Sequence, residues 1–250
     1  MGSAFLISES SSLSQDRGPK VRTLCARKLG RAGSLIAGFR MGVQGVSMRR
    51  EDFKDARCVI RGNVFGKPDL NRVEWEGHTL MVKDVKDKPF LFRWTVGLYL
   101  IEKEWRIYSR LAGIQGIPRI IERIDRFTFA MEFVPGRPVQ RGDALSPSFF
   151  PSLEGILKEV HARGIVHLDL RHKGNILVSE GGRPFLVDFN SAVSFNAKGP
   201  LRRFLFPFLQ WIDRGGLLKL KARISPASMT PREKMLLKRF NRIRRLWIFN

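Results

Sequence analysis

Three short apolar runs in the C-terminal half, "GIV", "ILV" and "PFLV", each lie close to a carboxylate or an amide. Asp169 follows the first run, Asn175 precedes the second and Asp188 ends the third. The turn residues "EGGR" predict a β-hairpin that pairs residues 176–179 with 184–188. Because the two strands of a hairpin are antiparallel, this pairing brings Asn175 and Asp188 to the same end, beside Asp169. No other feature constrains the fold as strongly.

These three side chains suit one kind of chemistry. An amide oxygen and a carboxylate at close range are hard-oxygen ligands of the kind that Mg²⁺ prefers. A second carboxylate nearby can accept a proton from an attacking hydroxyl group. We therefore predict a site for phosphoryl transfer, with Asn175 and Asp188 as metal ligands and Asp169 as the base.

The part of the chain before this stretch is predicted to be rich in β-structure. Short runs with partial alternation, separated by turn residues, indicate three consecutive antiparallel strands. A helix follows, in which apolar residues recur every three or four positions from Leu98 to Ala112. Two further strands come next. The five expected strands lie within residues 57–65, 72–77, 78–85, 117–124 and 126–134.

The remainder is predicted to be mainly helical. Residues 145–164 form an amphipathic pattern that Gly164 ends. Two more helical patterns lie within residues 200–250, and the second begins with Thr230 as a cap and Glu233 closing a capping box. A linker at "EFVPGRP" joins the two halves, an arrangement that favours a ligand held between them.

Composition and charge narrow the function classes. The chain of 250 residues is 43% hydrophobic and can bury a core, while its two cysteines make no disulfide framework. No apolar run approaches the roughly 18 residues of a membrane span, and no secretory signal is indicated, so we expect a cytoplasmic protein. A net charge of +22 implies an anionic partner.

The order of these features resembles the protein-kinase superfamily. "HLDLRHKGN" followed by "DFN" is similar to the catalytic loop H-R-D-L-x-x-x-N and the metal motif D-F-G of that family. "HARGIVHLDL" resembles the end of the helix before the loop, "MVKDV" the third-strand lysine motif, "EKEWRIYSRLAG" the helix αC and "FAMEFVPG" the hinge. The matches follow the family's order across residues 56–195, which makes the resemblance more specific than any single motif.

The resemblance implies roles for individual catalytic residues. Lys83 would hold the α- and β-phosphates of ATP, paired with Glu104, for which Glu102 is the alternative. Asp169 would be the base. Arg171 lies where protein kinases often place a lysine that faces the γ-phosphate.

The resemblance also implies ATP and Mg²⁺ as cofactors. Asn175 and Asp188 would bind Mg²⁺, as the residues themselves indicate. The glycine-rich loop and the hinge would contact the nucleotide through Gly62, Gly66, Lys67, Lys83, Glu132 and Val134.

Several departures from the family pattern point to a trimmed member. The interval from Asp169 to Asn175 is one residue longer than usual, with Gly174 available for a bulge. Asn190 replaces the glycine of D-F-G, the glycine-rich loop is degenerate, and no A-P-E motif follows. The pattern is more similar to the RIO-type and lipopolysaccharide-kinase (Kdo/WaaP-like) branches than to large eukaryotic kinases.

The expected fold class is α+β, a two-lobed protein-kinase-like fold with a β-rich N-lobe and a trimmed helical C-lobe. We expect a flexible basic extension over residues 1–50, the N-lobe over 51–135 and the C-lobe over 136–250. The expected function is transfer of the γ-phosphate of ATP to a hydroxyl acceptor. The acceptor is either a protein Ser/Thr or a lipopolysaccharide core sugar, and the residues leave this choice open.

Two other function classes stay open. The altered motifs favour a nucleotide-binding pseudokinase that acts as a scaffold without turnover. The charge favours a basic nucleic-acid-binding protein, although that hypothesis leaves the order of the motifs unexplained.

The basic C-terminal segment suggests an anionic surface as a partner. Residues 200–250 contain thirteen Lys and Arg but only two acids, interleaved with aromatic residues. This pattern predicts peripheral contact with the inner face of an anionic membrane. The expected docking face consists of Arg202, Arg203, Lys219, Lys221, Arg242, Arg244 and Arg245.

Overall fold

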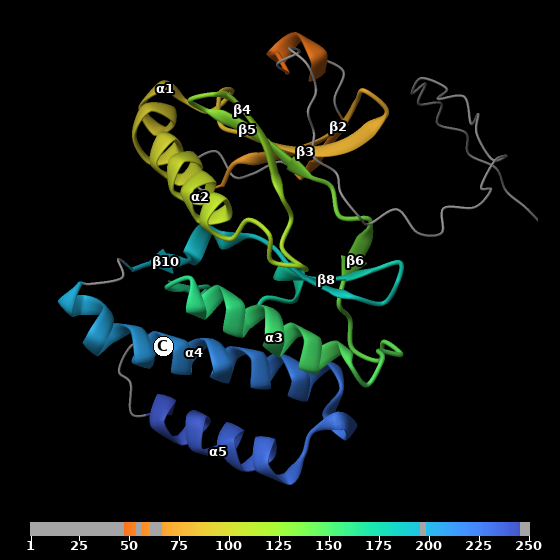
Figure 1. Ribbon diagram of the computed structural model, residues 1–250, viewed down its shortest axis with the longest axis vertical. Coiled ribbons are helices and arrows are strands. Elements are labelled where there is room, and N and C mark those ends of the chain that lie inside the picture. Colours follow the sequence, from red (N-terminus) through yellow and green to blue (C-terminus); the bar gives the residue numbers. More distant parts are fainter. Residues whose placement is uncertain (1–47, 54–56, 61–66, 196–198, 246–250) are drawn as a thin grey trace, which may run out of the picture. The chain divides into compact units, whose positions relative to one another are not determined.

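The computed structural model describes residues 48–53, 57–60, 67–195 and 199–245, and shows an α+β protein with antiparallel sheets and several helices (Figure 1). These residues belong to one compact unit, Val46–Asn250. Both predicted halves, 51–135 and 136–250, therefore fall within this unit. Most of the predicted extension lies outside the described residues.

The segment predicted to be rich in β-structure forms a five-stranded antiparallel sheet. Its strand order is β1-β2-β3-β5-β4. The strands are β1 (Arg57–Ile60), β2 (Asp69–Trp75), β3 (His78–Asp84), β4 (Ile120–Asp125) and β5 (Thr128–Glu132). All five were predicted, and the alternation of side chains along β3 explains the position of its lysine. Leu80 and Val82 pack on one face of the sheet, so Met81 and Lys83 point to the other.

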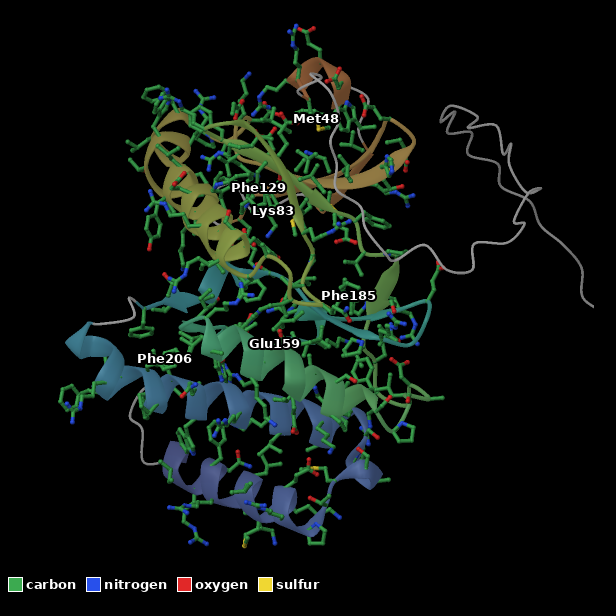
Figure 2. All side chains as sticks on the ribbon, viewed as in Figure 1. Met48, Lys83, Phe129, Glu159, Phe185 and Phe206 are labelled. Atoms are coloured by element: carbon green, nitrogen blue, oxygen red, sulfur yellow. The ribbon has the colours of Figure 1, made fainter. Side chains whose placement is uncertain are left out.

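The first described residues cover the outer face of this sheet. Met48 and Phe53 are buried against Val73 and Trp75, and Figure 2 shows Met48 above the strands. Arg50, in the 3₁₀ turn η1 (Arg50–Phe53), forms salt bridges with Asp84 at 2.8 Å and with Asp125 at 2.6 Å. Residues 48–50 of the predicted flexible extension are therefore part of the folded unit.

A helical segment covers the inner face of the sheet. It begins as α1 (Phe90–Phe92), continues through a π-helical turn η2 (Arg93–Gly97) and becomes α2 (Leu98–Arg110). Ile101 and Tyr108 of the apolar stripe that predicted this helix are at most 1% exposed, Leu98 and Trp105 are half-buried, and Ala112 lies exposed beyond the end of the helix. Trp105 meets Phe129 of β5 edge-on, with ring centroids 5.9 Å apart.

The remaining elements are mainly helical, as predicted. They are α3 (Phe149–Ala162), α4 (Pro200–Ile224) and α5 (Pro231–Arg245), together with the short strand β7 (Ile165–Val166), which pairs with β10 (Val193–Ser194). Gly164 ends the α3 region with a φ of 73°, a conformation that favours glycine. The capping box forms: Thr230 N donates to Glu233 Oε2 at 2.7 Å, and Glu233 N donates to Thr230 Oγ1 at 3.2 Å.

The segment predicted as a linker is in part a strand of a three-stranded sheet, so that prediction was wrong there. The segment at "EFVPGRP" includes strand β6 (Gly136–Pro138), which pairs with β8 (Ile176–Ser179), and β8 pairs with β9 (Pro184–Leu186). Val178 O lies 2.5 Å from the position of a Cβ on Gly136, so glycine permits this close approach. One core cluster then runs from α2 and β5 to α3 and α4, and the described residues include no helix long and apolar enough to cross a membrane.

Candidate active site

The predicted hairpin forms, and hydrogen bonds join Asp169 to Asn175 at its end. Ile176 pairs with Leu186, and Val187 N donates to Asn175 O at 2.9 Å, so Asn175 and Asp188 lie at the same end of the hairpin. Asn175 Nδ2 donates to both O and Oδ2 of Asp169, each at 3.0 Å. Since both amide hydrogens point to Asp169, the amide oxygen of Asn175 faces away from it.

The extra residue of the loop is accommodated by a turn. Lys173–Asn175 form the 3₁₀ turn η3, and Asn175 N donates to His172 O at 3.1 Å. A Cβ on Gly174 would lie 2.9 Å from the His172 ring. A tight turn with a glycine at its centre therefore replaces the expected bulge.

Two residues of the site have left-handed backbone conformations. Leu168, just before Asp169, has a φ of 66°, and Asp188 has a φ of 63°. Such conformations cost about 1 kcal/mol or more in residues other than glycine, and they persist only where surrounding contacts hold them. The contacts here are hydrogen bonds to both main-chain nitrogens. Asp213 accepts from Leu168 N at 2.7 Å, and Tyr108 Oη accepts from Asp188 N at 3.2 Å.

A buried ion pair links the sheet to α2. Lys83 Nζ donates to Glu104 Oε1, and the two side chains are 7% and 0% exposed. Lys83 is labelled in Figure 2. Glu102, the alternative partner, instead forms salt bridges with Arg106 at 2.7 Å and Arg123 at 2.9 Å. The expected pairing of Lys83 with Glu104 is therefore present. Glu104 faces Lys83 because the helical period of α2 turns Glu104 inward and Glu102 outward.

The charges around this pair affect neighbouring carboxylates differently. Burial raises the pKa of Glu104, the charge of Asp188 raises it further, and Lys83 only partly offsets these effects. Burial also acts to raise the pKa of Asp188, but the charges of Lys83 and Lys67 outweigh it and leave the pKa of Asp188 lowered. Asp188 is therefore ionised at neutral pH, as a metal ligand must be.

Asp213, on α4, organises the loop that carries Asp169 and was missed in the sequence. Its carboxylate is 0% exposed and accepts hydrogen bonds from His167 N at 2.7 Å, Leu168 N at 2.7 Å and His161 Nε2 at 2.9 Å. One signal was visible: Asp213 is one of only two acids in residues 200–250, within the apolar stretch "FLQWID". A buried carboxylate needs such donors, since water cannot reach it.

His167 has a structural role in this loop. Asp169 N donates to its Nδ1 at 3.3 Å, so the proton lies on Nε2, which faces Val187 O at 3.2 Å. Burial lowers the pKa of His167, in agreement with a neutral ring. The histidine thus joins the loop of Asp169 to the strand that ends at Asp188.

The other predicted residues have different positions. Lys67 Nζ lies 3.7 Å from Asp188 Oδ2. Arg171 is exposed, and its main-chain oxygen accepts from Arg223 at 2.5 Å. Glu132 N donates to Arg119 O at 2.8 Å, so this hinge amide is not available to an adenine, and Val134 is buried. Gly62 and Gly66, the other residues predicted in the glycine-rich loop, lie outside the described residues.

Comparisons with known proteins add no assignment to this geometry. No protein-family model matches the chain, and no curated protein gives a significant match to it.

The donor set is compatible with Mg²⁺ and a nucleotide. Within the described residues, no group of three or more His, Cys, Asp and Glu side chains gathers as a metal site. Mg²⁺ usually takes one or two protein ligands and completes its shell with water and phosphate oxygens. The oxygens of Asp188 and Asn175 match that smaller requirement.

We expect Asp213→Asn to unfold more easily than the wild type. The asparagine would keep one acceptor oxygen but place an amide group against N–H donors, so buried groups would lose their partners. The expected loss is about 3 kcal/mol in the free energy of unfolding, measured by urea titration. The exposed Glu159→Gln on α3 is the control. A stability within about 0.5 kcal/mol of the wild type would show that Asp213 does not organise the loop.

The choice between the two glutamates has its own test. Glu104→Gln should weaken binding of ATP about tenfold or more, because Lys83 would lose its charged partner. Glu102→Gln should bind ATP like the wild type, since this side chain pairs on the protein surface. Isothermal titration of both variants distinguishes the roles, and equal losses would contradict the assignment of Glu104.

Proposed function

We propose that the protein is an ATP-dependent phosphotransferase with a two-lobed, kinase-like fold. The observation that carries this proposal is the buried Lys83–Glu104 pair beside Asp188, with Asp169 hydrogen-bonded to Asn175 at the end of the same hairpin. These five residues come from separate elements. A structural ion pair alone would not require a carboxylate base and an amide at the adjoining turn.

The proposed lobes follow the two sheets. The five-stranded sheet with α2 would form the N-lobe over residues 51–135, and the three-stranded sheet with α3, α4 and α5 the trimmed C-lobe over 136–250. Lys83 and Glu104 belong to the first, and Asp169, Asn175 and Asp188 to the second. The site would thus draw on both lobes.

Each residue would contribute one step of binding or proton transfer. Lys83 would hold the nucleotide phosphates, with Glu104 orienting its ammonium group. Asp188 and Asn175 would hold Mg²⁺, which when bound neutralises charge on the phosphates. Asp169 Oδ2 would accept the proton of the acceptor hydroxyl, with the carboxylate oriented by Asn175 Nδ2. Lys67 and Arg171 would add positive charge near the phosphates.

The two alternatives make different predictions for the same residues. A pseudokinase would bind nucleotide without turnover, and the replacement of D-F-G by D-F-N favours it. A nucleic-acid-binding protein would not need Lys83 and Glu104 buried together, so the buried pair favours the phosphotransferase.

The deciding experiment is an acceptor assay. Wild type and Lys83→Met are incubated with γ-labelled ATP and Mg²⁺, with lipopolysaccharide in one arm and a generic protein substrate in the other. Label in one acceptor with wild type only would support the proposal and name the acceptor class. Tight nucleotide binding with no label in either arm, and no release of phosphate, would favour the pseudokinase. Salt-dependent binding of DNA or RNA without turnover would favour the third hypothesis.

An anionic membrane remains a proposed partner, with a smaller docking face than predicted. Lys221 is excluded because it is buried and forms a salt bridge with Glu233 at 2.6 Å. Lys219 lies over the Phe240 ring at 5.1 Å. Arg203 is exposed next to Phe204, which is 77% exposed, so the start of α4 combines charge with an apolar side chain. Arg242 is also exposed, and the side chains of Arg202, Arg244 and Arg245 lie outside the described residues.

We expect Arg203→Glu to weaken sedimentation with anionic vesicles. Each basic residue near such a surface gains about 1 kcal/mol, so a charge reversal should lower the bound fraction severalfold at low salt. Neutral vesicles should bind neither protein, and high salt should release the wild type. Equal binding of wild type to anionic and neutral vesicles would contradict the proposal.

A further inference from the structure

Helix α2 carries Glu104, the partner of Lys83, and also contacts the Asp188–Asn190 segment at several points. Lys103 Nζ donates to Asn190 O at 2.7 Å. Tyr108 Oη accepts from Asp188 N at 3.2 Å, and the Tyr108 and Phe189 rings meet edge-on with centroids 5.2 Å apart. The helix that orients Lys83 thus also holds the segment that carries Asp188.

Asn190 holds the Asp188 carboxylate directly. Its Nδ2 donates to Asp188 Oδ1 at 2.8 Å, and its main-chain nitrogen donates to the same oxygen at 3.4 Å. The amide nitrogen must face the carboxylate, because an amide oxygen there would oppose a second acceptor. Asp188 Oδ1 is therefore occupied by Asn190, and Oδ2 lies on the side of Lys67.

A glycine is not needed at position 190. Phe189–Ser191 form the 3₁₀ turn η4, closed by a hydrogen bond from Ala192 N to Phe189 O at 3.0 Å. Asn190 is not among the residues with positive φ, so its backbone is accessible to any residue. Glycine would lose the side-chain hydrogen bond to Oδ1 and would give the turn more conformational freedom. Asparagine instead adds a donor at the point where the carboxylate must be held.

We propose that Asn190 and Lys103 are positioning residues that form a latch on Asp188. Asn190 orients the carboxylate so that Oδ2 is presented to a cation, and Lys103 ties the turn of Asn190 to α2. Both bonds are made between groups of the protein itself, so the latch we propose requires neither ATP nor a covalent modification to form. This inference rests on the proposed phosphotransferase function and adds the way in which its metal ligand is held.

The test compares Asn190→Gly, Lys103→Met and Lys103→Arg with the wild type. The first measurement is the Mg²⁺ concentration at which binding of ADP reaches half of its maximum. Binding of ADP is measured by calorimetry. Loss of a hydrogen bond to a carboxylate should raise this concentration about tenfold in Asn190→Gly, with a smaller rise in Lys103→Met. Lys103→Arg keeps a donor and should restore the wild-type value. Binding of ADP in EDTA should be the same in all four proteins.

The second reading uses the protein without ligands. Amide hydrogen exchange of residues 186–195 should be faster in Asn190→Gly and Lys103→Met than in wild type, because the latch holds this segment before any ligand binds. The exposed Lys158→Met on α3 is the control and should match wild type in both readings. If Asn190→Gly does not fold, Lys103→Met alone provides both readings.

The outcomes separate the latch from the function on which it rests. Wild type that binds ADP with Mg²⁺, and variants equal to it in both readings, would overturn the latch and leave the function intact. Wild type that shows no Mg²⁺-dependent binding of ADP would overturn both. A raised Mg²⁺ requirement together with faster exchange of residues 186–195 would establish the latch.

Discussion

Asp169→Asn should lower ATP turnover about a thousandfold, as expected for loss of a general base, while leaving Mg²⁺-dependent nucleotide binding at the wild-type level. An amide oxygen at Asp169 Oδ2 has almost no affinity for a proton, so the acceptor hydroxyl would lose its base. The main-chain oxygen of residue 169 would still accept from Asn175 Nδ2, which keeps the loop in place. The measurement is turnover with the acceptor that the labelling assay identifies, next to titration with ADP.

The control for this substitution is Asp87→Asn, an exposed carboxylate just after β3. It carries the same change of charge and should turn over like wild type. Turnover by Asp169→Asn within a few-fold of wild type would contradict the assigned base. A loss of nucleotide binding in Asp169→Asn would instead show that the side chain supports the site structurally.

Asp188→Ala should abolish Mg²⁺-dependent nucleotide binding. The alanine removes a carboxylate whose pKa is lowered by Lys83 and Lys67 against the effect of burial, and Asn175 alone would offer the metal a single neutral oxygen. Binding of ADP in EDTA should remain, because Lys83 and Glu104 are unchanged. Calorimetric titration with and without Mg²⁺ separates the two contributions.

A comparison with Asp188→Asn makes this prediction sharper. Asparagine keeps the shape and an oxygen but not the charge, so we expect Asp188→Asn to retain Mg²⁺-dependent binding of ADP, but only at a higher Mg²⁺ concentration than wild type. Mg²⁺-dependent binding by Asp188→Ala equal to that of wild type would exclude Asp188 as the metal ligand. Circular dichroism of the variant guards against loss of the fold, since Asp188 also has a left-handed backbone.

The D-F-N sequence favours a pseudokinase when considered alone, and the structure changes its meaning. From the sequence alone, Asn190 can only be described as the residue that replaces the glycine of the D-F-G motif. In the structure, its amide nitrogen donates at 2.8 Å to Oδ1 of Asp188, the proposed metal ligand. The substitution thus adds a contact to the site, and turnover remains the experiment that separates the two functions.

Local patterns in the sequence were enough to locate most of the secondary-structure elements and the residues of the hairpin site. Alternation and turn residues located the five strands of the larger sheet, the 3.6-residue period located α2 and α3, and "TPRE" marked the start of α5. These signals are short in range, because they depend on side-chain direction and hydrogen bonds within a few residues. The proximity of Asn175 and Asp188 also follows from a short-range signal, because the single turn between them defines how strands β8 and β9 pair.

The contacts between distant segments could not be predicted from local patterns and became visible in the folded structure. Glu104 was preferred to Glu102 from the helical period, yet its burial against Lys83 depends on how α2 packs on the sheet. Strand β6 was taken for a linker, because a three-residue strand has no pattern of its own and forms only where β8 offers an edge. Lys221 was assigned to a basic surface but is buried beside Glu233. Asp213 holds a loop about 45 residues away, and no local pattern reveals which donors a carboxylate will meet once the chain has folded.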